Sequence, residues 1–234
     1  MPLWLKIAEG PIFRFTIILL VLGLARLIML SVIELVAARQ RSGKREARLK
    51  AILSDTLRWL FPIGRINEAH QLYSYASFVL HLGILLTLFT LGNHIEILRV
   101  NTGLAWPPVR KSLLDFLTLC SIAGGLYLLL HRIYVRNSRS LSRTMDYVLL
   151  VILMNIFISG FIAGQTWNPV PYDSLMLFHT LNGLLMLGTI PFTKIAHCIL
   201  FPLIRLSSEI GWHLVPRAGQ KTIDSLYGPE GRKI

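Results

Sequence analysis

The chain has 234 residues, of which 53% are hydrophobic and 15% are charged, and its mean hydropathy is +0.58. A soluble domain averages about 25% charged residues, so this composition argues against a soluble domain and indicates an integral membrane protein. The formal charge of +12 does not indicate nucleic-acid binding, because the positive residues lie between apolar stretches. Cys120 and Cys198 lie inside such stretches and are too few for a self-contained iron–sulfur cluster.

Five stretches are long enough to cross a bilayer, which takes about 20 predominantly apolar residues each. They lie near residues 12–37, 72–98, 113–134, 146–165 and 175–203. Every backbone polar group in lipid must find its partner inside the protein, so each stretch is predicted to be a helix. The sequence therefore predicts an all-α membrane protein, with a five-helix transmembrane bundle over residues 1–204 and a cytoplasmic tail over 205–234.

The charges of the connecting segments predict the orientation. Segments 39–70, 132–145 and 205–234 hold seventeen Lys and Arg residues, whereas the segments on the other side of the bundle hold five. Cytoplasmic loops carry the excess of Lys and Arg in membrane proteins. We therefore expect the N-terminus outside and the C-terminus in the cytoplasm, in a multi-pass protein of a bacterial or archaeal cytoplasmic membrane.

The basic segment 39–70 also contains a helical pattern of apolar residues. This pattern predicts an amphipathic helix that lies in the lipid headgroup region or docks a cytoplasmic partner. Its apolar positions are Leu49, Ile52, Leu53, Leu57 and Leu60. Within the spans, the pairs Gly160–Gly164 and Gly124–Gly125 predict close approaches between helices.

Two histidines in the last apolar stretch, His179 and His197, are eighteen positions apart. On a continuous helix this spacing returns the side chain to the same face, about 27 Å further along. One helix face would thus offer an imidazole near each side of the membrane. Ionisable residues inside a spanning helix are costly and suggest a functional site, and neutral imidazole is a common axial ligand of haem iron.

Bis-imidazole ligation needs partner histidines at matching depths on a second helix. His94 lies near the outer end of the second span and His81 in its inner half. Depth therefore pairs His94 with His179 and His81 with His197, which gives two haems across the bilayer. Thirteen residues turn an ideal helix by about 220°, so His81 and His94 share a face only if the helix deviates near Gly92.

The alternative pairing follows from the helix face alone. His70 and His81 are eleven positions apart and share a face, so His70 would pair with His197 and His81 with His179. His131 ends the third span beside Arg132, where a solvated or lipid-facing histidine is expected. Arg26 lies deep in the first span and needs a partner, for which a haem propionate is one candidate and Glu34 a weaker one.

Two sequence stretches resemble a known family. Residues 78–85 (FVLHLGIL) and 179–197 (HTLNGLLMLGTIPFTKIAH) are similar to the ligand helices of the membrane cytochrome b of respiratory nitrate reductase, its gamma subunit. The wider family includes the cytochrome b subunits of sulfite-reductase-linked and heterodisulfide-reductase-like complexes. The resemblance implies a five-helix fold with its N-terminus outside, in which helices two and five supply four haem ligands and quinone reacts near the outer haem.

Carried over by this resemblance, His81 matches the first ligand, His179 the third and His197 the fourth. The ten-residue offset of the nitrate reductase subunit places the second ligand at Leu91, and His94 is the nearest substitute. A thirteen-residue spacing resembles that of the cytochrome b of bc-type complexes. The charged segment 39–70 and the tail after Arg205 favour the sulfite-reductase-linked branch.

The sequence therefore predicts a cytochrome b subunit with two haems b, which transfers electrons between menaquinone or ubiquinone and a cytoplasmic iron–sulfur subunit of a heterodisulfide-reductase-like complex. Further membrane or periplasmic subunits are expected, and the chain is not expected to be catalytic alone. Arg110, Lys111 and Asp115, at the outer mouth of the third span, are the candidate quinone residues, with lipid anchoring as their alternative. The alternatives are the gamma subunit of a nitrate reductase, a haem-free membrane anchor for a cytoplasmic enzyme, and a transporter.

Overall fold

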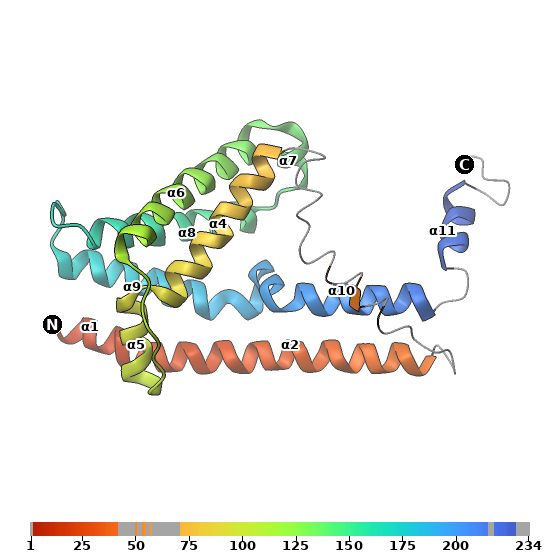
Figure 1. Cartoon of the computed structure of the whole chain (residues 1–234), viewed down its shortest axis with the longest axis horizontal. Coiled ribbons are helices and arrows are strands. Elements are labelled where there is room, and N and C mark those ends of the chain that lie inside the picture. Colours follow the sequence, from red (N-terminus) through yellow and green to blue (C-terminus); the bar gives the residue numbers. More distant parts are fainter. Residues whose placement is uncertain are drawn as a thin grey trace. The chain divides into compact units, whose positions relative to one another are not determined.

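The computed structural model describes residues 2–41, 71–214 and 218–227, together with Lys50, Leu53, Ser54 and Leu57. Within these residues all regular structure is helical (Figure 1). Five helical segments are long and apolar enough to cross a membrane: Leu3–Ala37, Gln71–Thr90, Lys111–Tyr134, Thr144–Ala163 and Tyr172–Phe192. The chain is thus an all-α, multi-pass membrane protein, as the sequence predicts.

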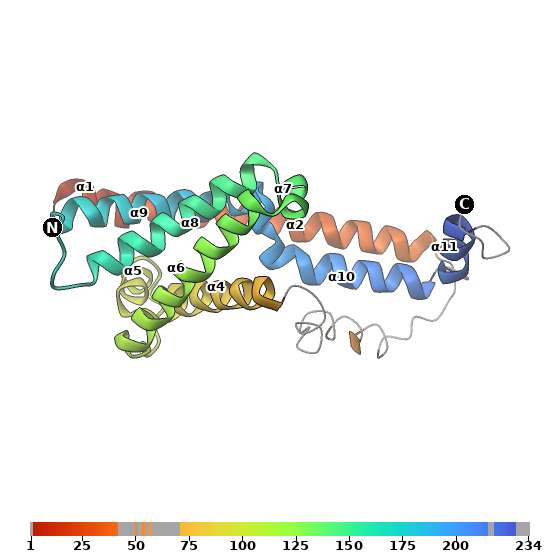
Figure 2. The same ribbon diagram turned by 90° about the horizontal axis from the view of Figure 1, so that it is seen from above.

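The described residues form two compact units. The first holds residues 2–20 and 71–189, and the second holds the described residues from 21 to 57 and from 190 onward. The helices of the first unit are α1 (Leu3–Ile7), the π-helix η1 (Ala8–Ile12), the first turns of α2 (Phe13–Arg41), α4 (Gln71–Thr90), α5 (Gly92–Thr102), α6 (Lys111–Tyr134), α7 (Arg136–Leu141), α8 (Thr144–Ala163) and α9 (Tyr172–Thr189). Neighbours in the chain are neighbours in space, because α4 packs on α6, α6 on α8 and α8 on α9 (Figures 1 and 2).

Small residues bring these helices close together. A Cβ built on Gly83 of α4 would lie within bonding distance of the Ser121 hydroxyl of α6, and one built on Gly124 would lie 3.0 Å from the Ala76 carbonyl oxygen. On the other side of α6, a Cβ on Gly125 would meet the Met154 sulfur of α8. Gly124 and Gly125 therefore act in helix packing, as predicted. Small residues let backbones approach in membranes, where apolar helices gain little by leaving lipid.

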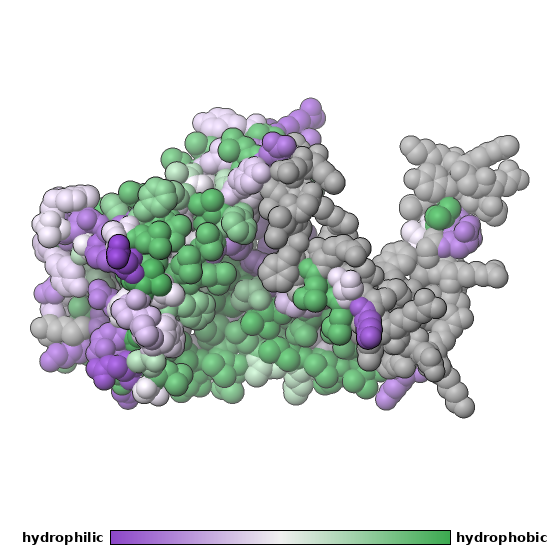
Figure 3. Space-filling model, viewed as in Figure 1, coloured by the Kyte–Doolittle hydropathy of each residue, from purple (hydrophilic) through white to green (hydrophobic). Residues whose placement is uncertain are grey.

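The core of this unit is narrow and its outer surface is apolar. Five buried residues form its main cluster: Ala76, Leu80, Leu128, Leu150 and Phe157. Figure 3 shows hydrophobic residues over the sides of α4 and α6 and hydrophilic residues towards the ends of the helices. Large apolar side chains such as Phe78, Leu85 and Leu126 are exposed on these helices. This distribution suits a bundle whose solvent is lipid.

The second predicted span, 72–98, is not one helix. α4 ends at Thr90, Leu91 adopts an extended conformation (φ −74°, ψ 128°), and α5 begins at Gly92. The following loop satisfies carbonyl groups at the end of α4, since Trp106 Nε1 donates to Phe89 O (2.6 Å) and Val109 N to Thr90 O (3.0 Å). The helix therefore deviates beside Gly92, through a complete break of the helix.

The second unit contains the rest of α2, the short 3₁₀ helices η2 (Ile190–Phe192) and η3 (Lys194–Ala196), α10 (His197–Leu214) and α11 (Ala218–Tyr227). Its structure corrects the prediction of one continuous helix over 175–203. Proline cannot donate a hydrogen bond inside a helix, and α9 gives way to 3₁₀ turns at Pro191. Thr193 then caps η3, and a Cβ on Gly23 of α2 would overlap the Pro191 ring. The eighteen-residue spacing of His179 and His197 therefore does not define one helix face.

Several predictions fall partly or wholly outside the described residues. Most of segment 39–70 lies outside them, including the apolar positions Leu49, Ile52 and Leu60, and so does His70. α10 runs through residues 204 and 205, and the division into 1–204 and 205–234 stays a prediction.

Candidate functional site

His94 and His179 meet inside the first unit. His94 lies in the first turn of α5 and His179 in the second turn of α9, and both side chains are half-buried. Their ring centroids are 6.1 Å apart and their ring planes differ by only 7°. The break at Leu91 makes this arrangement accessible, because His94 does not have to follow the helical turn of α4.

Each of these rings is oriented through its Nδ1 atom. His94 Nδ1 lies 2.9 Å from the Thr87 carbonyl oxygen, near the end of α4, and His179 Nδ1 lies 3.0 Å from the Ile156 carbonyl oxygen of α8. A carbonyl can only accept, so in both histidines Nδ1 carries the proton and donates it. The Ser159 hydroxyl lies 3.2 Å from His179 Nδ1 and itself donates to the Asn155 carbonyl oxygen (2.6 Å).

The other two predicted ligands share this feature. His81 Nδ1 lies 2.7 Å from Ser77 O, and His197 Nδ1 lies 2.7 Å from Lys194 O. In all four histidines Nδ1 therefore carries a proton that it donates to a backbone carbonyl. Histidines that bind metals through one nitrogen typically donate the other N–H to a carbonyl, which fixes the tautomer and the ring orientation.

The stacked rings of His94 and His179 bring together two imidazoles from α5 and α9, and these two side chains would be the ones to hold a haem iron. Among the described residues, no three His, Cys, Asp or Glu side chains gather into a metal site. A haem brings further ligands of its iron in its own macrocycle, so two histidines would be enough to hold one.

Gly160 of α8 makes room for this arrangement. A Cβ built at this position would lie 2.7 Å from His179 Cε1, closer than side-chain carbons approach. The sequence predicts Gly160 only as a packing residue. In the structure it forms, with Ile156 and Ser159, the surface against which the His179 ring lies. The signal available in the sequence was the pair of small residues Ser159–Gly160 inside a predominantly apolar helix.

His81 and His197 are both exposed. His81 belongs to the first unit and His197, the first residue of α10, to the second, so their pairing stays a prediction. Arg26 and Glu34 of α2 are also exposed, and the role of Arg26 at a haem propionate is likewise untested.

The candidate quinone residues lie at the start of α6. Lys111 forms an ion pair with Asp115 (Nζ to Oδ2 2.5 Å), and Arg110 is the exposed residue before the helix. The ion pair joins two of the three residues named from the sequence, one helical turn apart. Their role in binding quinone stays a prediction.

His131, predicted as a solvated or lipid-facing residue, packs on two aromatic rings. Its ring is half-buried against Tyr73 and Tyr127, at centroid distances of 4.8 and 5.8 Å. Its Nδ1 atom is buried and has no hydrogen-bond partner among the described residues. This packing arises because α4 lies across this end of α6, which hydropathy does not reveal. His131 thus lacks the carbonyl contact that the four predicted ligands have.

Comparison with known proteins identifies two relatives of the chain. A protein of Nitratidesulfovibrio vulgaris is 31% identical over 175 residues, which cover 74% of this chain and 76% of that protein. One component of the dihydromethanophenazine:CoB–CoM heterodisulfide reductase of Methanosarcina barkeri is 31% identical over 155 residues, covering 57% of this chain and 59% of that component. No family model matches the chain, and no solved structure matches it significantly.

Proposed function

This chain belongs to the protein family of its Nitratidesulfovibrio vulgaris relative and is a distant relative of a heterodisulfide reductase component, and we propose that it is the dihaem cytochrome b subunit of a membrane-bound respiratory complex. In this proposal it connects the quinone pool with a cytoplasmic iron–sulfur subunit of a heterodisulfide-reductase-like enzyme. The name of the Methanosarcina barkeri relative supports this choice of partner over a nitrate reductase.

The observation that carries the proposal is the pair of parallel rings of His94 and His179, 6.1 Å apart. Two neutral imidazoles in an apolar bundle lose their hydration, and axial ligation of an iron would offset that loss. The carbonyls of Thr87 and Ile156 accept the Nδ1–H groups, which raises the basicity of the nitrogens facing the iron. A bound haem b would supply one-electron transfer at a potential tuned by these ligands and their surroundings.

The second proposed haem is held by His81 and His197. Both histidines donate from Nδ1 to a carbonyl, as the first pair does. Two haems at different depths are what electron transfer across the bundle requires. In the proposal, quinone reacts at the outer mouth near Arg110, Lys111 and Asp115, and Arg26 pairs with a haem propionate.

The haem b content of the purified chain, measured as the pyridine haemochrome, tests the proposal. We expect two haems per wild-type chain and one in each of His94→Ala, His179→Ala, His81→Ala and His197→Ala. His131→Ala is the matched control, because this histidine lies in the bundle but lacks the Nδ1–carbonyl contact. It should retain both haems.

Three outcomes would contradict parts of the proposal. Loss of one haem in His70→Ala with full content in His94→Ala would assign the fourth ligand to His70. A wild-type chain with a single haem would contradict one of the two proposed sites. The variants that lose this haem would show whether the inner or the outer site is the real one. A colourless wild-type chain that still copurifies with its partner would replace the proposal by the haem-free anchor.

A further inference from the structure

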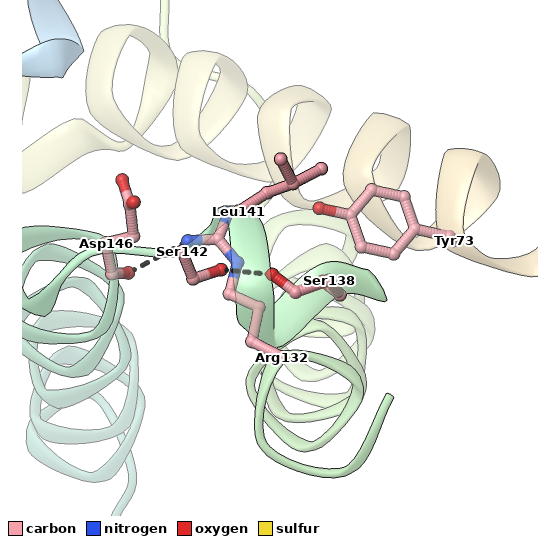
Figure 4. Close-up of a pocket in the computed structure, with 6 residues that line it drawn as sticks. All are labelled: Tyr73, Arg132, Ser138, Leu141, Ser142 and Asp146. Carbon is pink, nitrogen blue, oxygen red and sulfur yellow. Dashed lines mark hydrogen bonds between the residues drawn. The ribbon is translucent and has the colours of Figure 1, made fainter. Parts of the chain in front are cut away.

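A second polar site lies at the opposite end of α6 from Lys111. A cavity of about 230 Å³ opens where α6, α7 and α8 meet beside the first turn of α4 (Figure 4). Its lining combines a guanidinium, a carboxylate and three hydroxyl groups with one apolar side chain: Tyr73, Arg132, Ser138, Leu141, Ser142 and Asp146. Small-molecule pockets usually measure about 300–1,000 Å³, so this cavity suits a head group.

Arg132 is the positive centre of this cavity. Its Nη1 donates to the Asp146 carbonyl oxygen (3.0 Å), and the Tyr147 hydroxyl donates to the Arg132 carbonyl oxygen (3.0 Å). These two bonds join the end of α6 to the start of α8 and hold the guanidinium at the cavity. Because its partner is a neutral carbonyl, the bond does not cancel its charge. A guanidinium has five N–H donors in a planar fork that matches a phosphate.

The hydroxyl groups are arranged around this charge. Ser142 Oγ donates to the Ser138 carbonyl oxygen (2.8 Å), which leaves its oxygen as an acceptor, and both serines line the cavity near Arg132 (Figure 4). The Tyr73 ring packs on His131 at a centroid distance of 4.8 Å, which holds its hydroxyl at the wall formed by α4. The cavity thus offers both donors and acceptors.

The connection between α6 and α8, which forms part of the cavity wall, is rich in cations. The opposing charge is Asp146, whose Oδ2 accepts from the Arg143 backbone N–H (2.8 Å) and caps the start of α8. The same connection carries three more cations, Arg136, Arg139 and Arg143, all exposed. The cavity lining itself therefore holds one guanidinium and one carboxylate, and the three further cations lie on the connection outside the lining.

The cavity also lies at the level where lipid head groups are expected. α6 ends at Tyr134 and α8 begins at Thr144, and both are apolar enough to span a membrane. Basic pockets between spanning helices bind anionic head groups. We propose that this cavity binds the phosphoglycerol head group of an anionic phospholipid, with Arg132 on the phosphate and the hydroxyls and Asp146 on the glycerol. The proposal does not depend on the haem assignment.

Native mass spectrometry of the delipidated full chain tests this proposal. Phosphatidylglycerol, phosphatidylethanolamine, phosphatidylcholine or inorganic phosphate is titrated into the detergent-solubilised protein at constant ionic strength. The wild type should bind one phosphatidylglycerol more tightly than the other two lipids. Arg132→Gln should weaken this binding about tenfold or more, as expected for loss of a hydrogen bond to a charged group. Arg139→Gln, which removes the same charge from an exposed position, should bind like the wild type.

Ser138→Ala is a second test in case Arg132→Gln fails to fold. Among the described residues, no hydrogen bond of the Ser138 hydroxyl connects two helices, so this variant should keep the fold. It should weaken phosphatidylglycerol binding about threefold or more. Equal losses in Arg132→Gln and Arg139→Gln would reduce the effect to general surface charge and overturn the proposal. So would equal affinity for all three lipids, or binding of inorganic phosphate that competes with phosphatidylglycerol at equal concentration.

Discussion

At the scale of single residues, the proposed site depends on the acceptors of the histidine protons. Ile156 O lies in the middle of α8, where a helix carbonyl is normally covered by the side chains of the next turn. The residue four positions later is Gly160, so the imidazole of His179 can reach this carbonyl at 3.0 Å. His94 uses Thr87 O, one of the last carbonyls of α4, which also accepts from the Leu91 backbone N–H (3.3 Å) at the end of the helix.

Gly160→Ala should therefore disturb the outer haem site. The added Cβ would lie 2.7 Å from His179 Cε1, so the ring must move and its bond to Ile156 O must lengthen. We expect the purified variant to lose much of one haem, measured as the pyridine haemochrome. Gly164→Ala is the matched control, since its Cβ has no neighbour closer than 3.5 Å. Equal haem content in the two variants would show that the His179 ring need not occupy this position.

At the scale of helices, the α4–α6 contact predicts a swap experiment. Gly83→Ala would place a Cβ in contact with the Ser121 side chain, which is fully buried. Overpacking of this kind costs about 1–3 kcal/mol of unfolding free energy. The variant should unfold at a lower temperature in detergent, and adding Ser121→Gly should restore part of the loss. Gly183→Ala, with no atom within 4 Å of its Cβ, should not lower the unfolding temperature. If the double variant is as unstable as Gly83→Ala, the contact is not the cause.

The break at Leu91 leads to a second prediction at this scale. Trp106→Phe removes the Nε1–H that donates to Phe89 O at the end of α4, which should cost about 1 kcal/mol of unfolding free energy. The Thr87 carbonyl at this end of α4 also accepts from His94 Nδ1. The variant should therefore broaden the absorption spectrum of the proposed outer haem. Trp167→Phe changes an exposed tryptophan of the α8–α9 connection and serves as the control. If Trp106→Phe has the unfolding free energy and the haem spectrum of the wild type, Trp106 does not stabilise the end of α4.

The sequence predicts the spans well and their interruptions poorly. Hydropathy locates each apolar helix because lipid imposes length and composition on it. Hydropathy does not show where a helix breaks inside an apolar stretch, since the stretches around Leu91 and Pro191 stay apolar on average. Depth along the chain was enough to group His94 with His179, whereas the helix-face argument against this pair assumed a continuous helix. The acceptors Thr87 and Ile156 are backbone groups, which no side-chain pattern reveals.

At the scale of the whole molecule, the two units separate the proposed ligands. His81, His94 and His179 belong to the first unit and His197 to the second. In the proposed pairing, the ligands of the inner haem, His81 and His197, come from different units, whereas both ligands of the proposed outer haem come from the first unit. We expect His197→Ala to lower the unfolding temperature more for haem-loaded protein than for haem-free protein. A haem that binds only the folded chain raises its stability, and this variant would lose that contribution. Equal shifts, measured on haem-loaded and haem-free protein, would show that the second unit does not share a haem.

The orientation of the bundle in the membrane is a prediction that concerns the whole chain. Asn137, between α6 and α8, belongs to the basic side, and Leu104, between α5 and α6, to the other; both are exposed. In a background with Cys120 and Cys198 replaced by alanine, a membrane-impermeant maleimide should label Leu104→Cys in intact spheroplasts. It should label Asn137→Cys only after lysis. The reverse pattern would place the basic segments outside, contrary to the excess of Lys and Arg in cytoplasmic loops. It would also move the proposed quinone site to the cytoplasmic face, next to the partner subunit instead of opposite it.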